Sequence, residues 1–205
     1  MSATYALVFG LGLLCAGCAA PRTSWSKEEL STLGSFKNPP VRVLTVNDSA
    51  DLKILRTPSI DLTEADLSSK EYAKLAEMLK GTVTDSSQAG VGIAAPQVGI
   101  NRRVIAVQRY DKPGEPFEVY ANIKLEYMSS EKAEGPEGCL SIPGVRGTVS
   151  RSKEIGIRYG IMDGGHLRDT TERVSGFTAV IFQHEIDHLE GILFTDRIKD
   201  KNQEK

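Results

Sequence analysis

The stretch GFTAVIFQHEIDHLEG, residues 176–191, combines a long apolar run with two histidines spaced four residues apart. The run is too long and apolar for an ordinary strand, so it predicts a buried helix. On that helix His184 and His188 share one face about one turn apart, and both imidazoles can reach the same metal ion. Glu185 follows the first histidine and is placed to contact a water on that ion. The stretch therefore predicts a central helix that carries two ligands of a metal site.

The third ligand is expected upstream of this helix. Phe194 stands where the longer H-E-x-x-H-x-x-G-x-x-H pattern has its last histidine, and phenylalanine cannot bind a metal. Two upstream side chains remain: His166 in the probable hairpin turn MDGGHL, and Cys139 in the Gly- and Pro-bounded loop PEGCLSIPG. The loop is the better setting for a ligand, which favours Cys139. Cys139 and the two histidines of the helix would provide three metal ligands and leave a fourth coordination position for water, as in catalytic metal centres.

The composition is that of one globular domain. The chain has 205 residues, 25% of them charged, and a formal net charge of −2. This is not the basic footprint of a nucleic-acid-binding protein, and no nucleic-acid partner is expected. The order of helical and strand patterns favours an α+β fold in which antiparallel strands pack around one central helix.

Local patterns predict where the elements lie. Apolar residues at helical spacing predict a helix from Ser68 to about Lys80, ended by Gly81. Alternating or β-rich runs predict strands, and the turn residues between them predict hairpins. The strands are expected at 41–46, 102–110, 117–127, 154–161 and 167–175, with loop or extended chain at 51–63 and a loop at 131–138. The catalytic domain is expected at 41–198 with a charged tail at 199–205.

The N-terminus has the pattern of an export signal. Residues 1–20 contain an uncharged, mostly apolar run of the length of a signal-peptide core. Within it, LLCAGCAA resembles the lipobox of bacterial lipoproteins, which makes Cys18 the candidate for lipidation. An uncleaved anchor or an ordinary signal peptide is the alternative. Residues 21–40, rich in Ser, Thr, Lys and Pro, are expected to be a flexible tether, and cleavage before Cys18 would leave Cys139 as the one thiol of the domain.

Three stretches are similar to the signature motifs of peptide deformylases, in the same order and at comparable spacing. They are GVGIAAPQVG (90–99), EGCLS (137–141) and QHEIDHLEG (183–191). The resemblance implies a metal-dependent hydrolase that removes the formyl group from N-formylmethionyl peptides or nascent chains. It also implies a cytoplasmic location, whereas residues 1–20 suggest a membrane-anchored or exported lipoprotein.

The same resemblance implies roles for individual residues. Cys139, His184 and His188 become the ligands of a divalent metal, natively Fe²⁺ in many members; Zn²⁺, Ni²⁺ or Co²⁺ suit the same ligands. Glu185 takes a proton from water and delivers it to the leaving amine. The Gln97 side-chain amide and the backbone N–H of Leu140 stabilise the oxyanion. The substrate-binding residues are expected to be Gly90, Val91, Gly92, Glu137, Gly138, Arg146, Phe177, Val180 and Ile181, with Val91, Glu137, Phe177, Val180 and Ile181 around the methionine side chain.

Two other functions remain open from the sequence. One is an exported metal-dependent amidase or peptidase with the same fold and a different substrate. The other is a non-catalytic lipoprotein that keeps the fold as a binding module. Loss of Glu185, Gln97 or Cys139 would favour the binding module, and all three are present.

Overall fold

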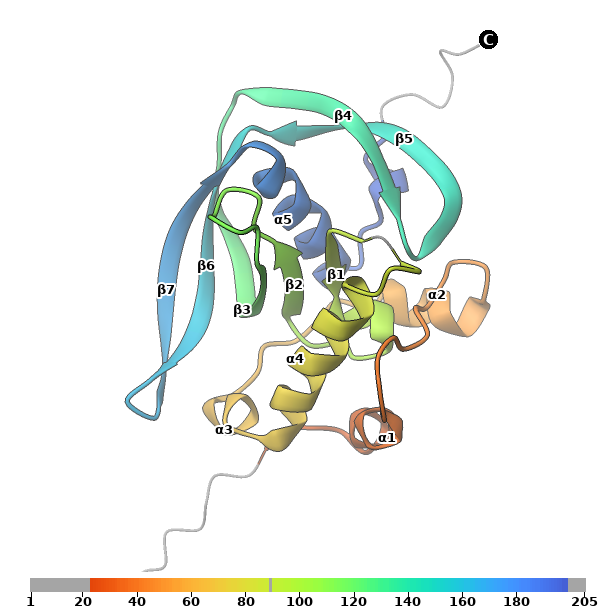
Figure 1. The fold of residues 1–205 in the computed structure, drawn as a ribbon, viewed down its shortest axis with the longest axis vertical. Helices are drawn as coiled ribbons and strands as arrows, with labels where there is room; N and C mark the ends of the chain where they lie inside the picture. The colour runs from red at the N-terminus through yellow and green to blue at the C-terminus, as the bar shows by residue number, and fades with distance from the viewer. Residues whose placement is uncertain (1–22, 89, 199–205) are drawn as a thin grey trace, which may run out of the picture.

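The computed structural model describes residues 23–88 and 90–198. Seven antiparallel strands form two sheets, and helices cover the larger one (Figure 1). The helices are α1 (Lys27–Ser35), α2 (Ser49–Leu55), α3 (Glu64–Leu67), α4 (Lys70–Val83), the 3₁₀ turn η1 (Ala95–Val98), α5 (Gly176–Leu189) and the 3₁₀ turn η2 (Phe194–Asp196). The strands are β1 (Gly92–Ala94), β2 (Val104–Gln108), β3 (Phe117–Met128), β4 (Lys132–Cys139), β5 (Ile142–Ser152), β6 (Glu154–Asp163) and β7 (His166–Ser175).

The larger sheet has the order β1-β2-β3-β6-β7, and its β1-β2-β3 part is buried between α5 and α4. Strand β2 shows this arrangement because its apolar residues are buried on both faces. Ile105 and Val107 pack with α5, whereas Val104 and Ala106 pack with α4. A strand buried on both faces has a continuous apolar run instead of an alternating one. The α+β architecture around a central helix is confirmed.

The smaller sheet, formed by β4 and β5, arches over α5 (Figure 1). Gln183 on α5 joins the two elements, because its side-chain amide both donates to and accepts from the backbone of Ser152 on β5, at 2.9 and 3.0 Å. Residues 131–138 were expected to be a loop, and this expectation is wrong. Residues 132–138 belong to β4, which pairs with β5. Most of its residues are exposed and two are glycines, so its sequence shows no alternation of apolar and polar side chains.

Two further expectations, one for a helix and one for a loop, also need correction. The predicted helix at 68–80 is observed as α4, but it continues through Gly81 to Val83. Gly81 lies against the Pro39 ring, which a Cβ would meet at 2.4 Å, so this glycine provides a close approach and not a helix end. The expected loop at 51–63 begins inside α2, which starts after Asp48, whose carboxylate accepts from two backbone N–H groups of the first turn.

Residues 23–40 are not a flexible tether. Ser26 begins α1 with a capping box, and Trp25, Leu33 and Phe36 are buried in the same core as α4. The buried Arg102 side chain holds the segment through two hydrogen bonds to Glu29, at 2.6 and 2.8 Å. The Ser- and Lys-rich composition suggested a linker, but a few large apolar side chains are enough to dock it.

The expected lipidation site Cys18, the apolar run at 1–20 and the charged tail at 199–205 lie outside the described residues. Within residues 23–88 and 90–198, no helix is long and apolar enough to cross a membrane.

Candidate metal centre and substrate cavity

The fold brings the three expected ligands together. Cys139 lies at the end of β4, and His184 and His188 lie one turn apart on α5. Their ligand atoms all lie within 4.8 Å of one another, and the Cys139 Sγ is 3.2 Å from the His188 Nε2. The alternative ligand, His166, is an exposed side chain at the start of β7, beside Glu64. The sequence preference for Cys139 therefore agrees with the geometry.

The donor set fits a divalent metal ion. A thiolate with two imidazoles is a set that binds transition metals in a tetrahedral arrangement with one further position. His188 is 1% exposed, and burial lowers its pKa well below the usual value. The ring is therefore neutral, which is the form in which an imidazole binds a metal. These residues could hold one ion at the floor of a cavity.

Glu185 lies beside the ligands on α5 and is buried. Burial raises its pKa to about 7, because the nearby His184 only partly offsets the loss of water around the carboxylate. Its Oε2 has no hydrogen-bond partner among the described residues. A buried carboxylate oxygen without a partner is costly in a purely structural position. Glu185 is thus held ready to accept a hydrogen bond from a molecule in the cavity.

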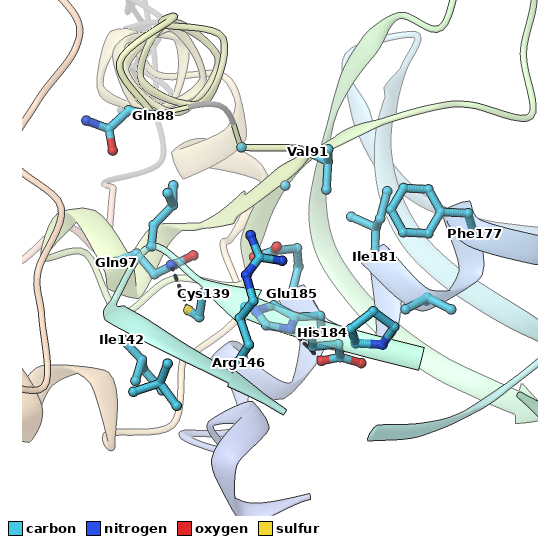
Figure 2. A pocket seen from close by; sticks show the side chains of 18 of the residues that line it. Gln88, Val91, Gln97, Cys139, Ile142, Arg146, Phe177, Ile181, His184 and Glu185 are labelled. Atoms are coloured by element: carbon cyan, nitrogen blue, oxygen red, sulfur yellow. Dashed lines mark hydrogen bonds and ion pairs between the residues drawn. The ribbon is translucent and has the colours of Figure 1, made fainter. Parts of the chain in front are cut away.

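Gln97 is oriented by three contacts of its amide. Its Oε1 accepts from the backbone N–H of Ala94 at 2.8 Å, so the Nε2 is the atom that faces the centre. That nitrogen lies 3.1 Å from the hydroxyl of Ser141. It also lies 3.7 Å from the Cys139 Sγ (Figure 2). Ser141, fully buried, was not singled out from the sequence, although it closes the EGCLS motif.

The segment expected to be a strand at 41–46 is extended chain without a regular ladder. It still links two motifs, because the N–H of Leu44 donates to the carbonyl of Gln97 at 2.8 Å and that of Val46 donates to the carbonyl of Ser141 at 2.9 Å. The strand expectation is wrong since this segment pairs with a 3₁₀ turn and a β4–β5 loop, neither of which offers a strand edge.

Glu137 lines the cavity, and two neighbouring side chains hold its carboxylate. Its Oε2 lies 2.9 Å from the His184 Nδ1, and its two oxygens accept from Arg151 at 2.8 and 3.0 Å. Arg151 in turn donates to Asp187 of α5 at 2.5 Å. These hydrogen bonds outweigh the effect of burial and lower the pKa of Glu137 to about 2. The expected contact of Glu137 with the methionine side chain stays a prediction, and its carboxylate also orients a ligand histidine.

A cavity of about 620 Å³ opens above the metal ligands. Figure 2 shows Val91, Ile181 and Phe177 on one side of it, across from Gln97 and Cys139. Phe177 is 56% exposed and stands at the mouth. Fourteen of the residues expected at the site line the cavity: Gly90, Val91, Gly92, Gln97, Glu137, Gly138, Cys139, Leu140, Arg146, Phe177, Val180, Ile181, His184 and Glu185. The sequence did not indicate five further lining residues, Gln88, Pro136, Ile142, Gly144 and Val145.

A Cys-His-His donor set with a buried glutamate beside it, at the floor of an open cavity, defines a metallohydrolase. Comparison with known proteins agrees: residues 41–204 match the family model of polypeptide deformylase. The chain belongs to the peptide deformylase family, whose metal-dependent enzymes remove the formyl group from N-formylmethionyl peptides.

Individual relatives support the assignment. The peptide deformylase of Prochlorococcus marinus (strain NATL2A) is 36% identical over 186 residues, which are 90% of this chain and 83% of that protein. A Met-Ala-Ser-bound crystal structure of a class I type b peptide deformylase from Acinetobacter baumannii has a TM-score of 0.66 at 35% identity, over 80% of this chain and 99% of that one. The peptide deformylase of Thermotoga maritima has the same TM-score at 29% identity, over 80% of this chain and all of that one.

Proposed function

We propose that Glu185, Gln97 and Leu140 carry out the deformylation chemistry at the Cys139–His184–His188 centre. The observation that carries this proposal is the convergence, in one cavity, of a partnerless buried carboxylate oxygen and an oriented amide donor beside the three ligand atoms. A divalent cation bound there supplies a Lewis acid and lowers the pKa of a water molecule.

The residues of the chain then divide the work. The Glu185 carboxylate takes the proton from the attacking water and delivers it to the nitrogen of the departing methionyl peptide. The formyl oxygen gains negative charge, and the Gln97 Nε2 and the backbone N–H of Leu140 donate to it. Glu137 keeps the His184 ring in place throughout, because its low pKa leaves it ionised at any working pH.

The remaining cavity residues position the peptide. The apolar group of Val91, Phe177, Val180 and Ile181 contacts the methionine side chain, which is unbranched and suits an apolar wall. Gly90, Gly92 and Gly138 let the peptide backbone approach closely. Arg146, exposed on β5, binds the peptide beyond its first residue.

We further propose that the native metal is Fe²⁺ and that the chain is attached to a membrane through a lipid on Cys18. The Cys-His-His set accepts Fe²⁺ as well as Zn²⁺, Ni²⁺ or Co²⁺, and the family resemblance favours iron. The LLCAGCAA sequence around Cys18 supports the attachment. Metal analysis after anaerobic purification tests the first proposal, because a thiolate–Fe²⁺ centre is sensitive to oxidation. Mass spectrometry of the N-terminus tests the second.

The test of the chemistry is formate release from a formyl-Met peptide, measured for the domain from Thr23 onward. We expect Glu185→Ala to lower kcat/KM by about 10²–10⁴-fold, the range for loss of a general acid–base group, with metal content unchanged. A formyl-Ala peptide serves as the substrate control for the methionine pocket. Retention of near wild-type activity in the metal-loaded variant would show that Glu185 is not the base.

A further inference from the structure

The first residues that the structure describes are fixed to one pole of the molecule. The backbone N–H and the hydroxyl of Ser24 both donate to Asp66 at 2.6 Å. Arg102, buried beneath the segment, donates to the Ser24 carbonyl at 2.7 Å and stacks on the Trp25 ring. Asp66 belongs to α3, so the chain enters the domain at α3.

A hairpin turn preceded by two exposed apolar side chains lies beside this entry point. The turn between β6 and β7 is held to α3 because the backbone N–H of Leu167 donates to Glu64 at 2.8 Å. At the end of β6, Ile161 is 41% and Met162 is 37% exposed. We call Ser24, α3 and residues 161–167 the α3 pole; Figure 1 shows α3 and the β6–β7 turn at the same end of the molecule.

The cavity lies at the other end of α4. The Trp25 indole donates to Ser69, the residue that caps the start of α4. Gly90, which lines the cavity, packs against Val83 at the end of α4. The helix has 14 residues and is therefore about 21 Å long. A surface that covers the α3 pole leaves the cavity open.

We propose that the α3 pole is a membrane-docking surface whose partner is a lipid bilayer, with Ile161 and Met162 entering its interfacial layer. This inference rests on the proposed attachment at Cys18. Five residues separate Cys18 from Ser24, and the six steps from one Cα to the next span only about 20 Å even when fully extended. Because residues 24–36 are docked and not a tether, the anchor holds this pole close to the bilayer.

The contact is apolar and not electrostatic. The arginine beside the turn is paired within the protein, because Arg168 lies 3.3 Å from Asp163. The His166 ring lies 3.6 Å from Glu64. No excess of cations faces the bilayer at this turn, so the docking does not require anionic lipids.

The test uses the full chain reconstituted in phosphatidylcholine vesicles, with a photoreactive benzophenone amino acid replacing one methionine. Position 162 tests the α3 pole. Met128 is the matched control: it is 58% exposed and pairs with Ile155, seven residues before Met162 on β6, hence about 23 Å away along the strand. We expect at least a tenfold higher yield of lipid adducts at position 162 than at position 128, with formate release unchanged in both proteins.

Two other outcomes would contradict the docking of the α3 pole, and they differ in what they say about the attachment at Cys18. Equal yields from a chain that sediments with vesicles would refute the docking of the α3 pole while leaving the attachment intact. A chain that stays in the supernatant would refute the attachment and the docking together. Formate release from the same samples reports on the deformylase activity independently of both.

Discussion

At the scale of single residues, Gly92 decides how much room the Glu185 carboxylate has. A Cβ at this position would lie 2.5 Å from the Glu185 Oε1 and 2.8 Å from a methyl group of Ile181. The backbone of Gly92 is not in a left-handed conformation, so the reason for glycine here is space alone. Gly92 is expected to let the substrate backbone approach closely, and it also leaves the space that the Glu185 carboxylate occupies.

Gly92→Ala is therefore expected to displace Glu185 and to lower kcat by at least about tenfold, since small misplacements of catalytic groups are costly. The metal ligands are not touched, so metal content should stay the same. Gly135→Ala is the matched control, because a Cβ at Gly135 meets nothing within 4 Å. Steady-state formate release checks both variants, and equal activity of the two would contradict the spatial argument.

The raised pKa of Glu185 predicts the pH dependence. Burial raises this pKa to about 7, and only the ionised carboxylate can accept a proton. The value of kcat/KM should therefore fall as the pH drops through this region, by tenfold per pH unit on the acid side. A bound cation favours the ionised form of Glu185 and moves the acid side of the pH profile to lower pH. A profile of the metal-loaded enzyme between about pH 4 and pH 9 checks the sign; activity that rises on acidification would exclude Glu185 as the base.

At the scale of elements, a buried chain of charges joins the small sheet to α5. Glu137 on β4, Arg151 on β5 and Asp187 on α5 are all buried. Arg197, after the helix, donates to the same Asp187 at 2.6 and 2.8 Å. The chain fixes the position of β4, which bears the Cys139 ligand, relative to the helix that bears the other two.

Glu137→Gln should weaken metal binding by about 10–100-fold, because His184 loses its charged partner. It should also destabilise the fold by about 3 kcal/mol, since Arg151 keeps a buried charge with less compensation. Glu131→Gln is the control: this glutamate pairs with Lys153 at the surface, and its loss should change the free energy of unfolding by less than about 0.5 kcal/mol. Metal titration and thermal unfolding measure the two effects, and a Glu137→Gln variant with wild-type metal affinity would refute the orienting role.

At the scale of the whole molecule, the catalytic domain includes residues that precede the family match. The match begins at residue 41, yet Trp25, Leu33 and Phe36 are part of the core around α4. That helix reaches from the α3 pole to the cavity, so the N-terminal segment supports the scaffold on which the motif 90–99 rests. A domain truncated at residue 41 would expose this part of the core to water.

Trp25→Ala is expected to lower the free energy of unfolding by about 3 kcal/mol, the lower end for loss of a buried aromatic side chain. Leu30→Ala, on the same segment but 42% exposed, should change it by less than about 0.5 kcal/mol. Urea unfolding followed by circular dichroism compares the two variants. Equal, small effects would mean that residues 23–40 behave as the tether that their composition suggested.

The sequence by itself determined the parts that depend on local pattern. The length of the apolar run predicted α5, and the spacing of His184 and His188 placed both ligands on one face. The absence of a downstream ligand indicated Cys139 as the third ligand. The motifs then identified the family. Each of these inferences rests on side chains close together along the chain or on chemistry that few residue types can perform.

Only the tertiary structure decided the rest, because the deciding partners are distant in sequence. Glu137, which lines the cavity, is also a partner of His184 through a contact across 47 positions. Strand β4 forms because β5 folds back on it, although its own sequence is that of a loop. Residues 23–40 dock because Arg102 and the α4 core receive them, 73 positions away in the case of Glu29. Composition and periodicity report local preference, and packing between distant segments overrides it.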